Sequence, residues 1–290
     1  MSAFPGVRIE LPTGLMELSV DAGLFHLDDL IGFAARANAK RGFLFLSKVL
    51  GKHWPVTPRL MYDIHTALAA QVPVDLPGPV VFIALAETAI GLGQGVFEAY
   101  RAAHPQREAL FLHTSRYHVS DTPIIEFAEA HSHAPRQFLH RPTDAALQRL
   151  LLNARSLVLV DDEASTGNTF WNLTAACRTL NPALERMHLA TITNFMGAQA
   201  NAALSQRFGL PVTIGAALSG LEIEAEDAEV VDRLLLARRD EAVEIGELPR
   251  RADARQHAVA VQMRQDAHEL IRHARRIVDL GGPRIERGAA

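Results

Sequence analysis

The stretch that decides the fold is residues 157–169, which read LVLVDDEASTGNT. Its first part is apolar without interruption, as in a strand buried on both faces, and acidic residues stand at the carboxyl end of that strand. A small, hydroxylated loop then opens a helical stretch that reaches about Leu180. A strand, an acidic end, a small loop and a helix in this order predict one unit of an open α/β sheet.

Other apolar runs of strand length lie at residues 80–85, 110–113, 189–192 and 212–217. Helical stretches follow two of them, at residues 91–103 and 198–208. This alternation predicts an α/β fold with an open, mostly parallel sheet flanked by helices. Such sheets bind ligands at the carboxyl ends of their strands, so the loop at 161–169 is the first candidate for a site.

Residues 1–75 differ from this pattern. Residues 7–11 and 15–20 alternate apolar and polar side chains around a Pro-Thr-Gly turn, which is typical of a hairpin. We expect a helix over about residues 28–38 and a second over about 57–71, the latter starting with a threonine N-cap followed by proline. The hairpin and these helices are expected to form a hood over the core.

The composition changes again after residue 220. Residues 222–229 are strongly acidic, and a helical periodicity continues to about Leu280. Acidic residues favour the N-terminus of a helix because they interact well with its dipole. We therefore divide the chain into three parts: an N-terminal part at 1–75, a core at 76–220 and an acidic helical extension at 221–290.

Composition excludes several classes of protein. The chain of 290 residues has 29 Lys and Arg against 33 Asp and Glu, so its net charge of −4 provides no basic field for nucleic acid. Its single cysteine, Cys177, excludes a disulfide framework. No apolar run approaches the ~20 residues of a membrane span, and residues 1–20 lack the pattern of a signal peptide. We expect a cytoplasmic protein that binds neither nucleic acid nor a membrane.

The loop after the acidic strand combines two chemical properties. Backbone N–H groups and hydroxyls of residues 165–169, at a helix N-terminus, provide a cradle for a phosphate dianion. Asp161 and Asp162 can accept hydrogen bonds from sugar hydroxyls, so the loop suits a ribose 5-phosphate. The alternative is a strand-to-helix turn whose polar residues only cap the helix. A P-loop is excluded because no G-x-x-x-x-G-K-S/T sequence occurs.

Residues 157–169 resemble the phosphoribosyl-pyrophosphate (PRPP) motif of type I phosphoribosyltransferases, in which apolar residues, an acidic pair and a phosphate loop follow in this order. Asp161 and Asp162 match the ribose-binding pair, and residues 166–169, TGNT, match the phosphate loop. The resemblance implies the type I phosphoribosyltransferase fold. It also implies the residues that bind ribose and the 5-phosphate: Asp161, Asp162, Glu163, Ala164, Ser165, Thr166, Gly167, Asn168 and Thr169.

A second loop begins directly after the apolar run 80–85. In type I phosphoribosyltransferases the loop after the corresponding strand binds pyrophosphate. The resemblance therefore assigns pyrophosphate to three residues of this loop: Glu87, Thr88 and Ala89. A dinucleotide fingerprint is discounted, because its last glycine would have to stand where the chain has Val96. Glycines that serve only helix packing are the alternative reading of this region.

Lysines occur only near the N-terminus, as Lys40, Lys48 and Lys52. The turn at 51–55, GKHWP, can present an ammonium and an imidazole to an anion, and pyrophosphate is the most highly charged part of PRPP. We predict that four basic residues contact pyrophosphate: Lys48, Lys52, His53 and Arg116. Arg116 would bind pyrophosphate oxygens through its bidentate guanidinium. The alternatives are chance clustering of lysines in an arginine-rich chain and, for the guanidinium, a surface ion pair.

The segment between residues 113 and 140 is polar and rich in histidine. His131 and His133 could chelate a metal from a strand, but no thiolate and no helical histidine pair accompany them. We favour a mobile loop, because the resembling enzymes have one there that closes over the reacting centre and excludes water.

The chain resembles one branch of the family over about residues 23–219: phosphoribosyltransferase-like proteins encoded in tellurium-resistance and stress-response gene clusters. The stretches that carry this resemblance are residues 38–55, 86–91, 114–117 and 131–133. Ala164 and Ser115 depart mildly from that branch, which tends to have a larger apolar residue and a threonine there. The additional C-terminal domain of that branch has no obvious match in residues 221–290, and the role of this extension stays open.

The resemblance implies that a nitrogen acceptor displaces pyrophosphate from C1 of PRPP, with Mg²⁺ held mainly by the substrate and assisted by Asp161 or Asp162. The implied catalytic residues are Asp161, Asp162, Arg116 and Lys52. The acceptor is expected to be a small molecule. The general base stays open, since neither Glu87 nor Glu163 has a spacing that singles it out. We also expect a homodimer.

Two other functions stay open. A regulatory protein with the same fold would bind PRPP or a nucleotide without catalysis, although no basic helix-turn-helix is apparent in the sequence. A phosphate-ester hydrolase would use Asp161 and Asp162 for metal ions, but the sequence lacks the further spaced carboxylates of a two-metal site.

Overall fold

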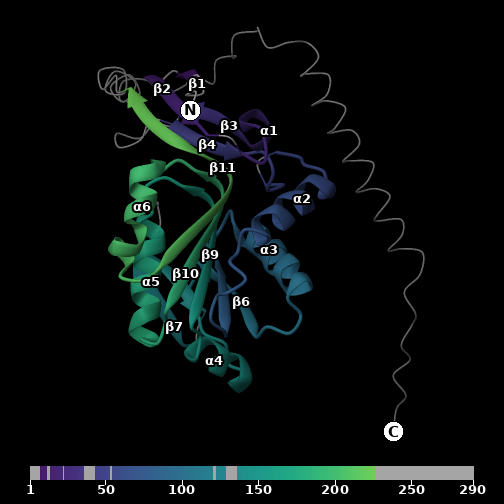
Figure 1. Cartoon of the computed structure of the whole chain (residues 1–290), viewed down its shortest axis with the longest axis vertical. Helices are drawn as coiled ribbons and strands as arrows, with labels where there is room; N and C mark the ends of the chain where they lie inside the picture. The colour runs from purple at the N-terminus through teal and green to yellow at the C-terminus, as the bar shows by residue number, and fades with distance from the viewer. Residues whose placement is uncertain are drawn as a thin grey trace, which may run out of the picture. The chain divides into compact units, whose positions relative to one another are not determined.

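A sheet of nine strands, in the order β1-β2-β11-β10-β9-β5-β6-β8-β7, forms the centre of the described chain (Figure 1). The computed structural model describes residues 7–11, 14–21, 23–35, 43–52, 54–119, 122–128 and 136–225, all of which belong to one unit of the chain. The strands of this sheet are β1 Val7–Leu11, β2 Gly14–Val20, β5 Val80–Ala84, β6 Ala109–Ser115, β7 Ile124–Ala128, β8 Arg136–His140, β9 Ser156–Ala164, β10 Arg186–Asn194 and β11 Val212–Ala225.

The central strands β11, β10, β9, β5 and β6 are parallel. The chain moves from β5 to β6 in one direction and from β9 through β10 to β11 in the other, so the order reverses between β5 and β9. The helix α3 (Ile90–Ala103) lies on one face of the sheet, whereas α5 (Asn168–Leu180) and α6 (Gly197–Phe208) lie on the other (Figure 1). Right-handed crossovers in opposite directions produce this arrangement. The predicted open, mostly parallel α/β sheet is confirmed.

Side chains of the central strands alternate between two apolar layers. In β5, Val80 and Phe82 belong to the layer with α3, and Val81 and Ile83 belong to the layer with α5 and α6. All of these side chains are fully buried. Because a strand covered on both faces needs apolar residues at every position, the run 80–85 has no polar interruption.

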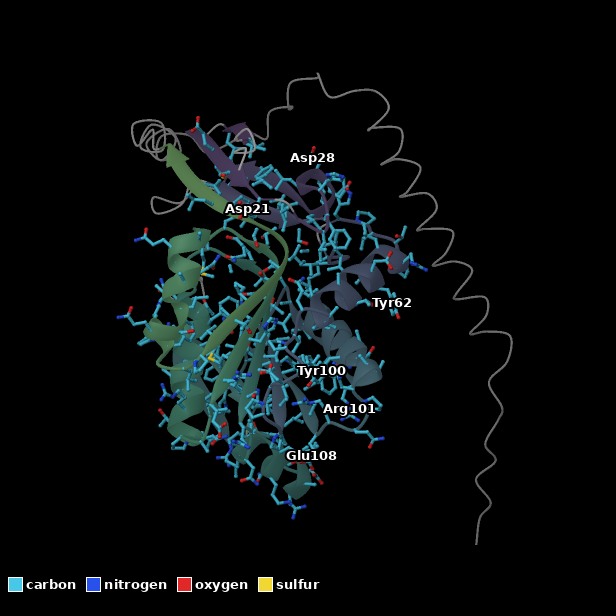
Figure 2. All side chains as sticks on the ribbon, viewed as in Figure 1. Asp21, Asp28, Tyr62, Tyr100, Arg101 and Glu108 are labelled. Carbon is cyan, nitrogen blue, oxygen red and sulfur yellow. The ribbon has the colours of Figure 1, made fainter. Side chains whose placement is uncertain are left out.

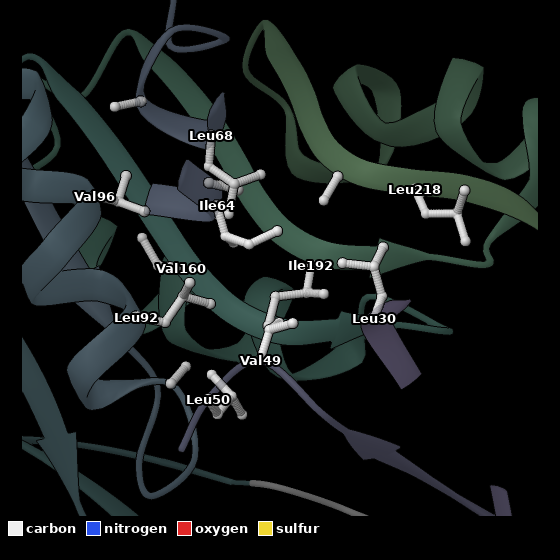
Figure 3. Packing of buried hydrophobic residues seen from close by; sticks show 14 of the residues in the cluster. Leu30, Val49, Leu50, Ile64, Leu68, Leu92, Val96, Val160, Ile192 and Leu218 are labelled. Atoms are coloured by element: carbon white, nitrogen blue, oxygen red, sulfur yellow. The ribbon is translucent and has the colours of Figure 1, made fainter. Parts of the chain in front are cut away.

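The N-terminal part of the chain packs onto the first of these layers. Figure 3 shows Leu30 and Val49 beside Ile192 of β10 and Leu218 of β11, and all four belong to one buried cluster. The N-terminal part is therefore fixed by apolar contacts to the carboxyl half of β10 and to the last part of β11 that is parallel to β10.

The helix α2 (Pro58–Ala69) begins as predicted. Thr57 is its N-cap, and the Thr57 hydroxyl oxygen accepts a hydrogen bond from the Leu60 amide at 3.3 Å. The helix packs closely against α3, since a Cβ on Gly95 would lie 2.0 Å from the His65 ring.

The predicted N-terminal hairpin is confirmed as β1 and β2, which pair in antiparallel fashion. It joins the main sheet through β11, which is parallel to β10 as far as Ser219 and antiparallel to β2 from Gly220 onward. At this change of partner a Cβ on Gly220 would lie 2.1 Å from the Ser19 carbonyl oxygen, so only glycine fits.

Because β11 continues to Ala225, residues 221–225 are strand and do not begin the predicted helical extension. The remainder of that extension lies outside the described residues.

The helix predicted over residues 28–38 is wrong. In its place the structure has α1 Leu27–Leu30, β3 Ile31–Ala35 and β4 Phe43–Ser47, and the end of the predicted helix lies outside the described residues. The two strands form a separate antiparallel sheet in which Phe33 lies opposite Phe45, with ring centroids 5.7 Å apart. A cross-strand aromatic pair stabilises strands against a weak local helix preference.

Where the structure describes the segment between residues 113 and 140, strands occupy part of the long polar loop that was predicted there, and residues 120–121 and 129–135 lie outside the described residues. The strand β6 extends into it, and β7 and β8 form an antiparallel hairpin whose second strand pairs with β6. Ile125 and Phe127 are buried, whereas Glu126 between them is exposed. This alternation gives the hairpin one apolar face, which packs against α5 and the sheet core.

The helix α4 (Ala145–Leu152) precedes β9 and begins at the N-cap Asp144, whose carboxylate accepts hydrogen bonds from the Ala146 and Leu147 amides at 2.9 Å. Within the described ranges of the chain, every helix is too short or too polar to cross a membrane.

Candidate functional site

Two loops leave neighbouring strands at the point where the strand order reverses. The end of β5 is joined to the middle of β9 by a hydrogen bond from the Leu85 amide to the Val160 carbonyl oxygen at 2.9 Å. Residues 86–89 continue from β5 toward α3, and residues 165–167, which follow the last residues of β9, lead to α5 on the opposite face. Open α/β sheets bind ligands at this position. The structure therefore brings together the two loops that the sequence singled out.

The turn at residues 165–167 resembles a phosphate cradle in its geometry. Gly167 has a φ of +70°, a conformation that favours glycine, and α5 begins directly after it. The Thr166 hydroxyl oxygen accepts a hydrogen bond from the Asn168 amide at 3.4 Å. The amides of this turn stand at the N-terminus of a helix of 13 residues, where N–H groups and the helix dipole favour an anion.

Residues of the α6 region hold this turn, and the sequence analysis did not predict this role for them. Arg207 donates a hydrogen bond to the Thr166 carbonyl oxygen at 2.6 Å and another to the Asn168 side-chain oxygen. A Cβ on Gly167 would lie 3.3 Å from the Met196 Sδ atom. These contacts join segments that are far apart in the chain, and no local pattern predicts them.

The acidic residues Asp161, Asp162 and Glu163 are half-buried and still belong to β9. The Asp161 Oδ1 atom accepts a hydrogen bond from the Asp162 amide at 2.9 Å. Three carboxylates thus stand in sequence at the strand end that leads to the phosphate cradle.

The loop at 86–89 is held by the end of β6. The Ala86 amide donates a hydrogen bond to the buried Thr114 hydroxyl oxygen at 2.7 Å, and the peptide bond between Ala86 and Glu87 is cis. Glu87 and Thr88 are half-buried, and Ala89 is fully buried. The sequence did not assign a role to Thr114, although it stands at the end of a predicted strand.

The glycines after this loop have different surroundings. A Cβ on Gly93 would lie 2.4 Å from the Ala84 Cβ atom, so glycine allows α3 to approach β5 closely. Gly91 has no atom within 4 Å of the corresponding position. Close packing therefore explains two of the glycines: Gly93 packs against β5, and Gly95 packs against α2. This agrees with the alternative interpretation of the sequence, in which the glycines serve helix packing.

Two predicted basic residues make main-chain contacts. The Lys52 ammonium group donates a hydrogen bond to the Glu87 carbonyl oxygen, which places a positive charge at the loop 86–89. Lys48 donates to the Asp28 carbonyl oxygen of α1 at 2.7 Å. Figure 2 shows Asp28 near the top of the described part of the molecule and Glu108, directly before β6, near its bottom. Both lysines thus belong to the N-terminal part that lies at the carboxyl ends of the parallel strands.

Arg116 directly follows β6 and is half-buried. Its Nε atom is buried and has no hydrogen-bond partner within the described ranges. A guanidinium with an unused donor next to the loop ends is suited to bind an anion. His53, the remaining predicted basic contact, lies outside the described residues.

Histidines gather where β6 and β8 meet. The His140 Nε2 atom accepts a hydrogen bond from the Val119 amide at 3.1 Å. Burial lowers the pKa of His140, and His118 and His113 nearby lower it further. The part of the chain that the structure describes contains no group of three side chains arranged to hold a metal ion, and His131 and His133 lie outside it.

The end of β9 has the donor set of a site for a hard cation. Asp161 and Asp162 supply carboxylate oxygens, which are the protein ligands that Mg²⁺ prefers. Two carboxylates do not complete the coordination of such an ion, so it would need further ligands from water or a bound molecule.

A family model described as phosphoribosyl transferase matches residues 30–221. The match includes both loops and the candidate PRPP motif. No curated protein matches the chain significantly.

Several solved structures are similar to the chain. Adenine phosphoribosyl transferase from Trypanosoma brucei, in complex with AMP, pyrophosphate and ribose-5-phosphate, is 11% identical, with a TM-score of 0.45 over 80% of this chain and 89% of that chain. Adenine phosphoribosyltransferase from Leishmania donovani is 12% identical, with a TM-score of 0.46 over 81% and 89% of the two chains. A hypoxanthine-guanine phosphoribosyltransferase from Bacillus anthracis is 13% identical, with a TM-score of 0.32 over 48% and 70%.

Proposed function

We propose that this chain, which belongs to the phosphoribosyl transferase family, transfers the phosphoribosyl group of PRPP to a nitrogen acceptor and releases pyrophosphate, with Mg²⁺ as cofactor. The observation that supports this reaction most is the pairing of β5 with β9 up to the hydrogen bond from Leu85 to Val160, because it places the loop 86–89 beside the strand end that carries Asp161 and Asp162. One loop has the properties of a pyrophosphate site and the other those of a ribose 5-phosphate site. In PRPP the reacting C1 atom joins these two groups, so a single substrate would span both loops.

The ribose 5-phosphate end is assigned to residues 161–169. The amides of the turn at 165–167 and the start of α5 bind the phosphate, because N–H groups and the helix dipole converge there. The carboxylates of Asp161 and Asp162 accept hydrogen bonds from the ribose hydroxyls and orient the sugar. They are also the residues that would hold Mg²⁺, which when bound offsets negative charge on the pyrophosphate oxygens.

The pyrophosphate end is assigned to residues 86–89 with Lys52 and Arg116. The nitrogen of the acceptor forms a bond to C1 and releases its proton, the bond from C1 to the pyrophosphate oxygen breaks, and the electron pair of that bond leaves with pyrophosphate. Lys52 already holds its charge at this loop, and Arg116 has an unused donor, so both can stabilise the charge that develops on the leaving group. Lys48 and His53 stay predicted contacts.

The experiment that tests the site is calorimetry with PRPP and Mg²⁺. We expect the double variant Asp161→Asn, Asp162→Asn to lose PRPP binding while it keeps its fold, judged by circular dichroism. The control is the double variant Asp75→Asn, Glu185→Gln, which removes two carboxylates from exposed ion pairs with Arg186 and Arg155 at the amino ends of β10 and β9. Unchanged binding in the first variant would overturn the assignment of the site.

Catalysis is tested by pyrophosphate release from PRPP with a panel of nucleobases and amines. Turnover with at least one nitrogen compound is expected, and the preferred compound identifies the acceptor. Tight PRPP binding without release against any acceptor would favour the regulatory alternative. The panel is broad because the acceptor is selected in this fold by a hood, for which we propose the N-terminal part of the chain.

We place the chain, over about residues 23–219, in the branch of the family from tellurium-resistance and stress-response gene clusters, on the sequence features quoted for it. The cytoplasmic location and the homodimer stay predictions. Light scattering on the full chain after size exclusion tests the dimer, and a monomer mass at micromolar concentration would contradict it.

A further inference from the structure

We propose that Arg207 of α6 is a positioning residue for the phosphate cradle: it fixes the turn at 165–167 in the conformation that binds the 5-phosphate. The proposal rests on the proposed function, because that function assigns the phosphate to this turn. It goes beyond the PRPP motif itself, since Arg207 lies far from the motif in the sequence and on another helix.

The contacts of Arg207 enclose the one glycine of the turn. Its guanidinium donates to the carbonyl oxygen of Thr166, which precedes Gly167, and to the side-chain oxygen of Asn168, which follows it. A Cβ on Gly167 would lie 3.6 Å from the Arg207 Nη1 atom. A planar guanidinium that binds both sides of a tight turn restricts that turn more than a single hydrogen bond would.

The bond to Thr166 also determines the direction of an amide. In a trans peptide unit the carbonyl and the N–H of the following residue point in opposite directions. By holding the Thr166 carbonyl oxygen toward α6, Arg207 directs the Gly167 N–H away from α6. That N–H becomes available to a phosphate in the turn, and Asn168 is held at the start of the helix by its side chain. Arg207 therefore acts through the turn.

Arg178 provides a matched control. It is also an arginine that links α5 and α6, and it donates a hydrogen bond from Nη1 to the Phe208 carbonyl oxygen at 3.0 Å. Neither residue belongs to the phosphate cradle. Loss of Arg178 removes a comparable contact between the same helices and leaves the turn at 165–167 untouched.

The experiment is calorimetry with two probes, ribose 5-phosphate and pyrophosphate, on the full chain and on Arg207→Met, Arg207→Lys and Arg178→Met. We expect Arg207→Met to bind ribose 5-phosphate about tenfold more weakly and pyrophosphate within about twofold of the unaltered chain. Arg207→Lys should recover part of the loss, because an ammonium can bind one of the two acceptors but lacks the planar fork. Arg178→Met should bind both probes as the unaltered chain does.

Steady-state kinetics separates positioning from catalysis. Arg207→Met is expected to raise KM for PRPP about tenfold with kcat changed by less than about threefold. The positioning proposal is overturned if the folded Arg207→Met or Arg207→Lys variant binds ribose 5-phosphate normally, or if Arg178→Met loses as much. If the unaltered chain binds neither probe, the proposed function itself fails, and this result is distinct from a loss confined to the Arg207 variants.

Discussion

The ammonium group of Lys52 donates a hydrogen bond to the main-chain carbonyl oxygen of Glu87. This contact connects the N-terminal part of the chain to the loop that follows β5. A lysine charge held at a main-chain oxygen stays next to the amides of the same loop, where a pyrophosphate would bind. The contact thus links the hood to the leaving-group end of the proposed substrate.

Lys52→Met should weaken the enzyme toward PRPP. We expect kcat/KM for PRPP to fall roughly tenfold or more, because a charge that stabilises the departing pyrophosphate is lost. The control is Arg59→Met on α2, which removes a positive charge from an exposed pair with Asp63 and should leave kcat/KM unchanged. Equal activity of Lys52→Met and the unaltered chain would show that the ammonium group has no part in the reaction.

Gly93→Ala should destabilise the protein while Gly91→Ala should not. The new methyl group at residue 93 would collide with the Ala84 Cβ atom at 2.4 Å, which forces α3 away from β5 and costs about 1–3 kcal/mol. At residue 91 the space is open, and alanine favours the helix by roughly 0.5–1 kcal/mol. Urea unfolding of both variants measures the difference. A midpoint for Gly93→Ala at or above that of Gly91→Ala would contradict the packing argument.

The parts of the fold that the sequence predicted well depend on local signals. The run 80–85 is apolar at every position because both faces of β5 are buried, and the motif at 157–169 contains its strand, turn and helix start within one short segment. The strand β3 was predicted as helix, because its stability depends on the pairing of Phe33 with Phe45 and on packing against the apolar layer of the sheet. Local propensity does not contain that information.

The same distinction holds for the candidate site. The sequence predicted the two loops and Lys52, since each has a recognisable composition. Arg207 and Thr114 were missed, because their roles arise from hydrogen bonds to Thr166 and Ala86 that only the folded chain brings together.

Cys177 should be unreactive in the folded protein. It is the only cysteine of the chain, it is buried in α5, and burial raises the pKa of its thiol to about 12. The thiolate that reacts with disulfide reagents is therefore scarce and inaccessible at about pH 8. We expect no labelling by a thiol-specific disulfide reagent in buffer and one labelled thiol per chain in concentrated urea. Rapid labelling of the native protein would show that α5 opens or that the thiol is accessible.

His188 should make the protein less stable in mild acid. The side chain is buried in β10, its Nδ1 atom lies 2.8 Å from the Thr213 hydroxyl oxygen, and its Nε2 atom has no partner in the described part of the chain. Burial lowers its pKa from 6.5 to about 4. The unfolded chain therefore binds a proton at a higher pH than the folded chain does. The free energy of unfolding is therefore unaffected by this group above pH 6.5, where the imidazole is neutral in both states. It decreases as the pH falls from 6.5 toward 4, because only the unfolded chain takes up the proton.

The size of this effect follows from the pKa difference. Between about pH 7.5 and about pH 5, His188 should reduce the free energy of unfolding by about 2 kcal/mol. His188→Gln lacks the imidazole. Its free energy of unfolding should therefore fall by about 2 kcal/mol less between these two pH values than that of the unaltered chain, even if the variant is less stable at every pH. Urea unfolding of both proteins at the two pH values gives the comparison. Parallel pH dependences would mean that His188 is already charged in the folded protein or that its burial has no effect on its titration.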